Sequence, residues 1–289
     1  MKVVITGSSG QVGRALLKST PGGLTAVGLT HAQLDIGDPQ AAASVIQAHR
    51  PDLIVNAAAY TAVDKAESEP EAAERANTTG PLNLAVAAAA TGARLIHLST
   101  DFVFDGLTSR PYATDAPTNP QSTYGRTKRG GEDAVMRSLP DRSVVLRTAW
   151  VYASQGSNFV RTMLRLMREK GAVRVVADQV GTPTTASSVA EVIWALAARP
   201  DMHGIYHWTD AGVASWYDFA VAIAEESAAL GLLPPGVRVD PIATEEYPTP
   251  AKRPSYSVLD KRSLLAQLSV NACHWRTNLR AVLKEMSHA

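Results

Sequence analysis

Three glycines, Gly7, Gly10 and Gly13, follow directly on a short β-branched run, Val3–Thr6, and open an amphipathic stretch. This G-x-x-G-x-x-G spacing limits the possible folds, because the backbone must turn tightly and the new helix must pack closely on the strand. The amino terminus of such a helix presents unpaired N–H groups and a positive dipole end to a phosphate. The position of the glycines in a strand–turn–helix unit therefore predicts a dinucleotide-binding turn, which also includes Ser9, Gln11 and Val12.

Short β-branched runs alternate with longer Ala-rich amphipathic stretches up to about residue 200. This alternation predicts βαβ units and a parallel sheet. The expected strands are Val3–Thr6, Ala26–Leu29, Leu53–Asn56, Leu95–Ser99, Val144–Arg147 and Val173–Ala177. Helices are expected to begin near Gln11, Pro39, Pro70, Ser122 and Asn158. The fold class is therefore α/β, with a Rossmann-type doubly wound parallel sheet.

The regular alternation weakens after about residue 150. A helix over Ser187–Arg199 and a strand over Ile205–Trp208 are expected to belong still to the sheet, whereas prolines punctuate the rest of the tail. We expect a dinucleotide-binding domain made of residues 1–152 and about 186–212. Residues of about 153–185 and 213–289 would form a smaller, discontinuous C-terminal lobe that binds the substrate.

Composition excludes several classes of function. Lys and Arg number 28 against 27 Asp and Glu among the 289 residues, and no run of like charges appears, so we expect no nucleic-acid partner. No apolar run approaches the ~20 residues that span a bilayer, and Lys2 leads straight into a strand, which favours a cytoplasmic chain without a membrane partner. Cys273 is the only cysteine, so a thiolate metal cluster is excluded, and we expect no metal site.

The end of the second predicted strand bears on the choice of cofactor. NAD-binding folds usually place an acid there for the ribose 2′-hydroxyl, but this chain has Leu29-Thr30-His31. NADPH is therefore favoured, with NADH as the alternative, because no arginine stands ready to bind the 2′-phosphate. Asp35 and Ile36 follow and are candidates for the adenine edge, and the other interpretation of Asp35 is a turn or capping residue.

Polar side chains that can assist the reduction of a carbonyl group follow in two segments. Thr100 and Asp101 end the fourth predicted strand, and Tyr124 and Lys128 lie four residues apart on one face of a predicted helix. A neutral tyrosine can protonate the alkoxide that forms when a carbonyl carbon accepts hydride, a lysine can stabilise the phenolate, and a threonine can donate to the oxyanion. A surface Tyr–Lys pair with a capping Thr is the alternative.

The chain resembles the extended short-chain dehydrogenase/reductase family over nearly its whole length, and within it the reductases of dTDP-4-keto-6-deoxysugars. The stretches that carry the resemblance are Asn56–Glu67, Ser99–Gly106, Arg147–Tyr152, Asp178–Thr184 and Pro250–Pro254. The resemblance implies that Thr100, Tyr124 and Lys128 are catalytic and that Asn77 belongs to a proton relay. It implies that the cofactor is lined by Ala57, Ala58 and Tyr60, and the sugar nucleotide by Thr61, Val63, Thr100, Asp101, Phe102, Trp150 and Arg253.

The activity implied by the resemblance is NADPH-dependent reduction of the 4-keto group of dTDP-4-dehydro-6-deoxy-L-mannose to dTDP-L-rhamnose. One alternative is a reductase of another dTDP-4-keto-6-deoxysugar, which would share the chemistry and differ in the face of the sugar that accepts hydride. A non-catalytic nucleotide-binding regulatory subunit and an epimerase that retains its cofactor are two others. The joint presence of Thr100, Tyr124 and Lys128 favours catalysis, because folding alone does not require the three together.

The sequence departs from the family at one place. Members that dimerise through a shared magnesium ion have glutamates where this chain has Ala15 and Ser187, and only Glu285 of that set is present. A hard divalent cation needs several oxygen ligands, so one carboxylate is insufficient. We therefore expect a monomer or a metal-independent homodimer.

Overall fold

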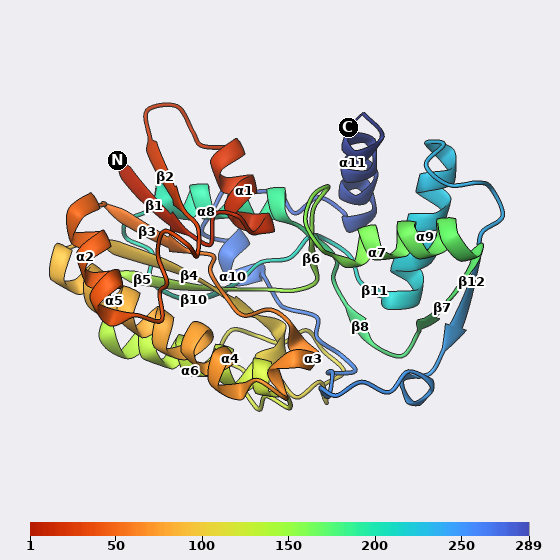
Figure 1. Ribbon diagram of the computed structural model, residues 1–289, viewed down its shortest axis with the longest axis horizontal. Helices are drawn as coiled ribbons and strands as arrows, with labels where there is room; N and C mark the ends of the chain where they lie inside the picture. Colours follow the sequence, from red (N-terminus) through yellow and green to blue (C-terminus); the bar gives the residue numbers. More distant parts are fainter. Residues whose placement is uncertain (289) are drawn as a thin grey trace.

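The computed structural model describes residues 1–288 and contains a central sheet of six parallel strands in the order β10-β5-β4-β3-β1-β2 (Figure 1). The strands are β1 (Lys2–Thr6), β2 (Thr25–Leu29), β3 (Leu53–Asn56), β4 (Arg94–Thr100), β5 (Ser143–Thr148) and β10 (Gly204–His207). The order reverses at β1, since β2 pairs on one side of it and β3 on the other. Such a reversal opens a crevice at the carboxyl ends of the strands, where α/β proteins bind ligands.

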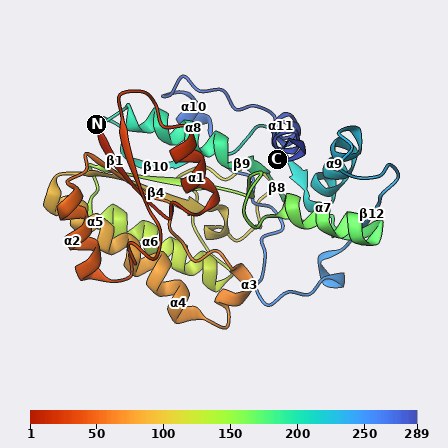
Figure 2. The ribbon, with the colours of Figure 1, turned by 45° about the horizontal axis from the view of Figure 1, so that its top comes forward.

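Helices cover both faces of the sheet (Figures 1 and 2). Leu16 and Ile193 pack on one face from α1 (Gln11–Lys18) and α8 (Ala186–Ala197). The other face is covered by α2 (Pro39–His49), α5 (Gly80–Thr91) and α6 (Thr123–Ser138). Asp38 accepts hydrogen bonds from the backbone at the start of α2, and Ser122 does so for α6. The expected helix starts on these elements are confirmed.

A second lobe packs beside the carboxyl edge of the sheet. Its helices, α7 (Phe159–Lys170), α9 (Trp216–Ala229) and α11 (Trp275–Ser287), share a separate apolar core that includes Val160, Phe219 and Leu279. Short strand pairs join the two parts, namely β6 (Val151–Tyr152) with β9 (Thr184–Thr185) and β8 (Val180–Gly181) with β11 (Ala214–Ser215).

Two of the expected strands lie in different parts of the fold. The strand expected at Ile205–Trp208 is β10, which pairs with β5 and completes the sheet. The strand expected at Val173–Ala177 exists as β7 (Ala172–Val176), but it pairs with β12 (Arg238–Ile242) in the second lobe and not with the central sheet. A β-branched run specifies a strand but not its partner, because pairing depends on segments far away in the sequence.

Irregular helical segments precede α5. They are α3 (Val63–Ala66), α4 (Pro70–Glu74) and the π-helix η1 (Arg75–Thr79). The widened turn carries the Asn77 carbonyl towards α6, where a Cβ added at Gly131 would lie 2.1 Å from that oxygen. Glycine is needed at this crossing because α6 and η1 approach too closely for any side chain.

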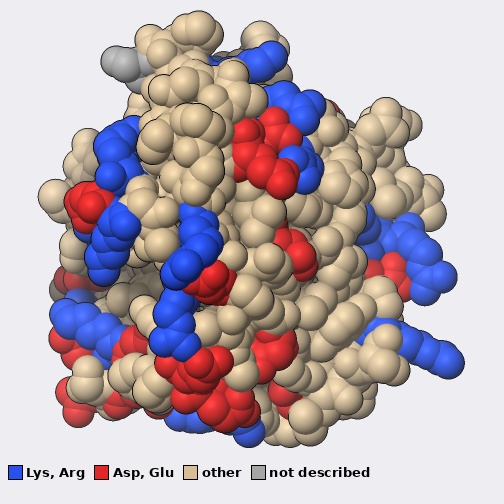
Figure 3. All heavy atoms as spheres, turned by 90° about the vertical axis from the view of Figure 1, so that its right-hand side faces the viewer, with Lys and Arg blue, Asp and Glu red and all other residues tan. Residues whose placement is uncertain are grey.

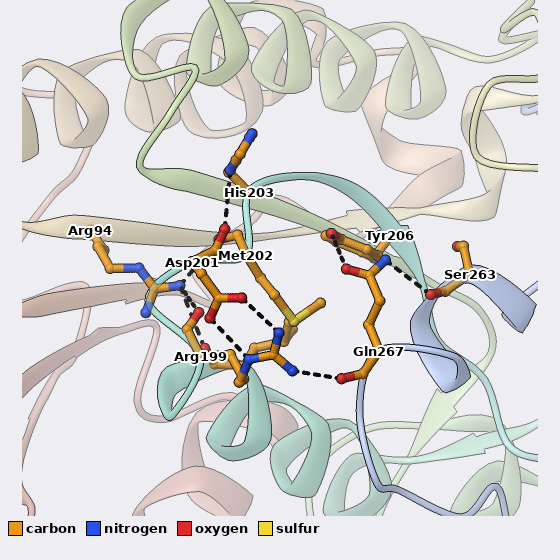
Figure 4. Close-up of polar contacts among 9 residues, drawn as sticks. Arg94, Arg199, Asp201, Met202, His203, Tyr206, Ser263 and Gln267 are labelled. Carbon is orange, nitrogen blue, oxygen red and sulfur yellow. Dashed lines mark hydrogen bonds and ion pairs between the residues drawn. The ribbon is translucent and has the colours of Figure 1, made fainter.

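Arg94 fixes the carboxyl end of α8 (Figure 4). Its guanidinium donates to the carbonyl oxygens of Arg199 at 2.9 Å and Met202 at 3.3 Å, and to two carbonyls in the last turn of the helix. Nearby, Tyr206 of β10 donates to the Gln267 side chain after α10 (Arg262–Leu265). These contacts tie α8, the edge strand and α10 together on the side of the sheet away from the crevice.

Within residues 1–288, no helix combines the length and apolar character needed to cross a membrane. The face that carries the second lobe mixes acidic and basic side chains (Figure 3).

Candidate functional site

The glycine turn lies against the first residues after β3 in the crevice of the sheet. Gly7 has φ +68°, and a Cβ there would lie 2.6 Å from the Ala58 nitrogen and 2.7 Å from the Ala57 carbonyl carbon. A Cβ at Gly13 would lie 2.4 Å from the Gly7 oxygen. Gly10 begins α1 without any capping side chain, so the first N–H groups of the helix stay free for an anion. The turn therefore fits the diphosphate of a dinucleotide, with Ala57 and Ala58 beside it.

The residues predicted for the adenine edge have other contacts. The Asp35 carboxylate pairs with Arg75 at 2.8 Å and accepts the Gly37 N–H at 2.9 Å. Ile36 is 4% exposed and packs in the core against Gly80. Arg75 reaches this rim from η1, which the sequence reasoning missed because the two residues belong to separate elements.

Gln11 connects the glycine turn with the second lobe. Its amide donates to the Val151 carbonyl at 3.4 Å and accepts from Asn158, the residue that caps α7, at 2.9 Å. Ser9 is exposed and Val12 is partly buried against the core. The turn that is expected to hold the cofactor is thus tied directly to the start of α7.

Thr100 and Tyr124 meet where β4 ends and α6 begins. The Phe102 and Tyr124 rings pack edge to face with centroids 5.5 Å apart. A Cβ at Gly125 would lie 2.3 Å from the Phe102 oxygen, so glycine permits this contact between the helix and the loop. The Glu67 carboxylate accepts from the Thr123 N–H at 2.7 Å and from its hydroxyl at 2.8 Å, which holds the first turn of α6.

Burial sets the ionisation of the two groups beside Thr100. Desolvation raises the pKa of the Tyr124 phenol to about 12, against the effect of its hydrogen bond with Thr100, so the phenol stays protonated at neutral pH. Desolvation also raises the pKa of Asp101 to about 6, and hydrogen bonds from Ser257 and Thr100 oppose the rise. The Thr100 hydroxyl donates to Asp101 at 3.0 Å and accepts the Phe102 N–H at 3.2 Å.

Lys128 lies one helical turn after Tyr124 and is 2% exposed. Its ammonium donates to the Leu98 carbonyl of β4 at 2.6 Å. Burial lowers the pKa of Lys128 to about 8, and the Glu132 carboxylate acts in the opposite direction. The structure thus brings Thr100, Tyr124 and Lys128 together at the carboxyl edge of the sheet.

A buried ion pair lies behind these residues. Glu132, one turn after Lys128, is fully buried and binds both Nε and Nη2 of Arg147 on β5, at 2.8 Å and 2.7 Å. Glu132 also accepts from the hydroxyl of Ser99, the neighbour of Thr100, at 2.6 Å. The sequence reasoning missed this pair, because Glu132 lies on α6 and Arg147 on β5 and no local spacing relates them.

Asn77 has structural contacts. Its amide oxygen accepts the Tyr60 N–H at 2.9 Å, and its amide nitrogen donates to the Tyr60 carbonyl at 3.0 Å and to the Thr127 hydroxyl at 3.2 Å. The Asn77 side chain therefore links the Tyr60 backbone to Thr127 of α6, the residue directly before Lys128.

The residues predicted for the sugar nucleotide come from three segments. Thr61 is exposed just before α3, and Val63 begins that helix. Trp150 follows β5 with φ +49° and stacks on Trp216 of α9, with ring centroids 3.5 Å apart. Arg253 binds the Asp64 carboxylate of α3 through both terminal nitrogens. Trp216 and Asp64 were not predicted, because their partners lie far away in the sequence.

Ala15, Ser187 and Glu285 line a cavity of about 360 Å³ between α1, α8 and α11. There, Glu285 pairs with Lys18 at 2.5 Å. In the described part of the chain, no three His, Cys, Asp or Glu side chains gather as a metal site would require.

Comparisons with known proteins decide the family. The model of the family described as RmlD substrate binding domain matches residues 1–288. The chain belongs to this family. An RmlD-family relative from Burkholderia thailandensis, a dTDP-4-dehydrorhamnose reductase, is 42% identical over 286 residues, which cover 96% of both chains. A probable dTDP-4,6-dihydroxy-2-methyloxan-3-one 4-ketoreductase from Streptomyces antibioticus is also 42% identical, over 99% of this chain and 96% of the relative.

Among solved structures, the dTDP-4-dehydrorhamnose reductase of Bacillus anthracis in complex with NADP is similar to this RmlD-family chain. Its TM-score is 0.92 at 34% identity, with 98% of this chain and 99% of that chain covered. The resemblance expected from the sequence and the Rossmann-type fold are confirmed.

Proposed function

We propose that this chain reduces the 4-keto group of dTDP-4-dehydro-6-deoxy-L-mannose with NADPH and releases dTDP-L-rhamnose. The observation that carries the proposal is the meeting of Thr100, Tyr124 and Lys128 at the carboxyl edge of the sheet, the same edge at which the glycine turn lies. The names and lengths of the RmlD-family relatives support it.

Tyr124 is the proton donor in this proposal. Its pKa of about 12 keeps the phenol neutral, so a proton is present at Oη at any physiological pH. The edge-to-face contact with Phe102 and the contacts of Glu67 with Thr123 restrict the ring and the helix turn that carries it. A fixed donor lowers the barrier because its orientation is set before the reaction begins.

Lys128 and Thr100 stabilise the charges that form. The Lys128 ammonium lies on the same helix face as Tyr124, where it stabilises the phenolate left after proton transfer. The Thr100 hydroxyl lies next to Tyr124 and would donate to the developing oxyanion of the sugar. Its hydrogen is directed to Asp101 in this structure, so substrate must redirect that hydrogen.

The cofactor would be held by the glycine turn and the first N–H groups of α1, with Ala57, Ala58 and Tyr60 along its length. When bound, NADPH supplies hydride to the carbonyl carbon. No acid follows β2 directly, and Asp35 is paired with Arg75, so no free carboxylate there repels a 2′-phosphate. We further propose that the chain works as a monomer or a metal-independent homodimer, in the cytoplasm.

The test is reduction of enzymatically generated dTDP-4-dehydrorhamnose, followed by the loss of NADPH absorbance and by chromatography of the product. We expect dTDP-L-rhamnose, with NADPH preferred to NADH. A parallel reaction with dTDP-4,6-dihydroxy-2-methyloxan-3-one tests the activity named for the Streptomyces antibioticus relative. A higher kcat/KM for that substrate, or a product with the opposite configuration at C4, would replace the proposal.

A further inference from the structure

A proline-rich segment of the second lobe returns to the first part of the chain. We call residues Tyr247–Ser255 the strap; it contains Pro248, Pro250 and Pro254. Figure 1 shows it running along the lower edge of the molecule from β12 back to α3. The strap packs closely against Gly106, where an added Cβ would lie 2.7 Å from the Pro254 Cα. The Ser255 hydroxyl donates to the Gly106 carbonyl at 2.9 Å.

The later part of the strap and the residues that follow it lie near the candidate site. Lys252 donates to Gln121, three residues before Tyr124, at 3.4 Å. Ser257, two residues beyond the strap, is buried near Asp101. The strap therefore spans the space between α3 and the loop that precedes α6.

Asp64 anchors the strap by a paired contact. Its Oδ1 accepts from Arg253 Nη1 at 3.0 Å and its Oδ2 from Nη2 at 2.7 Å. The Ala251 N–H donates to the same Oδ1 at 3.2 Å. These hydrogen bonds lower the pKa of Asp64, with Arg253 as the main cause, so the carboxylate is charged at neutral pH.

The pair leaves one edge of the Arg253 guanidinium available. Nη1 also donates to the Thr249 hydroxyl at 2.6 Å, so the hydrogens of Nη1 are in use. No acceptor among residues 1–288 contacts Nε, and Nη2 has one contact, to Asp64. A guanidinium has two edges that can form a fork of parallel hydrogen bonds. Asp64 takes the edge of Nη1 and Nη2, and the edge of Nε and Nη2 remains.

We propose that Asp64 is a positioning residue, which holds Arg253 so that the edge of Nε and Nη2 meets the diphosphate of the nucleotide sugar. The proposal rests on the proposed function for the identity of the substrate. Asp64 directly follows Val63, which is predicted to line the sugar nucleotide, on α3. The same short helix therefore carries a predicted substrate contact and the residue that orients Arg253. A side chain that is already oriented loses less conformational entropy when the ligand binds.

The experiment measures binding of dTDP by calorimetry, because this ligand carries the diphosphate and needs no turnover. Asp64→Ala should weaken dTDP binding about tenfold, the size of one charge-assisted hydrogen bond. Asp64→Asn keeps one acceptor, so its affinity for dTDP should lie between those of the wild type and Asp64→Ala. NADPH affinity and kcat at saturating sugar should stay within about twofold of wild type, so the loss appears in KM.

A double-mutant cycle separates positioning from a structural role. If Asp64 acts through Arg253, Asp64→Ala should change dTDP binding little in a chain that already carries Arg253→Ala. Lys252→Ala, which removes the exposed contact with Gln121, is the matched control and should leave dTDP binding unchanged.

Unchanged or tighter dTDP binding by Asp64→Ala would overturn the proposal, since Asp64 would then compete with the diphosphate. Additive losses in the cycle would also overturn it. A chain that binds dTDP as described but reduces no dTDP-4-keto sugar would refute the proposed function and leave this inference standing.

Discussion

The indole rings of Trp150 and Trp216 lie face to face, with centroids 3.5 Å apart and planes within 5° of each other. Trp150 holds φ +49°, a conformation that costs a residue other than glycine ~1–3 kcal/mol. Gly181 makes room beneath the stack, because a Cβ there would lie 2.6 Å from the Trp150 ring. The orientation of Trp150 at the crossing between the two parts of the chain therefore depends on a residue of α9.

Trp216→Ala should destabilise the protein, because it removes the ring on which Trp150 stacks and which Phe159 contacts. The expected loss in the free energy of unfolding is about 3 kcal/mol, the lower end for large aromatic truncations, since Trp216 is only partly buried. Trp216→Phe keeps an aromatic face and should lose ~1 kcal/mol. Urea denaturation measures both, and equal losses would show that a phenyl ring does not replace the indole in its contacts with Trp150 and Phe159.

Tyr124→Phe removes one hydroxyl and keeps the ring contact with Phe102. If Tyr124 donates the proton, kcat should fall roughly 10²- to 10⁴-fold while NADPH binding changes little. Lys128→Met should weaken both kcat and NADPH affinity, because its ammonium is expected to contact the ribose as well as the phenol. A Tyr124→Phe enzyme that keeps more than about a third of the wild-type kcat would remove Tyr124 from the mechanism.

The pH dependence of kcat/KM should follow Lys128. The pKa of Lys128 is lowered to about 8, so its positive charge is present below pH 8 and is lost as the pH rises through that value. The phenol of Tyr124 has a pKa of about 12 and does not titrate in this range. We expect kcat/KM for the sugar to decline above about pH 8. Lys128→Arg stays charged, so any remaining activity should lack this decline; the same decline in that variant would assign it to another group.

Glu132→Gln should destabilise the protein by about 3–5 kcal/mol, because it leaves the buried Arg147 guanidinium without its counter-charge. The double variant Glu132→Gln with Arg147→Met removes both charges and should regain part of the loss. Thermal or urea unfolding of the two variants gives the comparison. A double variant less stable than the single one would mean that Arg147 has sufficient partners in His207 and the Thr114 carbonyl.

Chelation should leave the assembly state unchanged. The cavity of Ala15, Ser187 and Glu285 offers one carboxylate, and Lys18 neutralises it. Light scattering with and without EDTA should give the same mass, and turnover should be equal in both buffers. A dimer that dissociates in EDTA would reveal a metal bridge built from other residues.

The sequence predicted the elements of the sheet well because local signals define them. Pro39 with Asp38 marks the start of α2, Ser122 caps α6, and Asn158 caps α7. The glycine turn and the threonine, tyrosine and lysine of the candidate site carry motifs of their own. Each signal lies within a few residues of the feature that it predicts, so the local sequence was sufficient to predict that feature.

Contacts between distant segments could not be predicted in this way. Asp64 and Arg253 are separated by 189 positions, and neither periodicity nor capping relates them. Trp216 looks like an ordinary residue at a helix start until the fold brings it to Trp150. The partner of β7 could not be predicted for the same reason, because the sequence of a strand does not specify which strand pairs with it.

The place of β10 in the sheet affects how the chain can be made. β5 is buried along its whole length, and one of its edges is completed only by residues 204–207, which follow α7 and α8 in the sequence. A chain emerging from the ribosome therefore carries β5 with an open edge until those residues appear, and an open edge can pair with a neighbouring chain. Any fragment that stops before residue 204 should aggregate during synthesis, however well its glycine turn is formed.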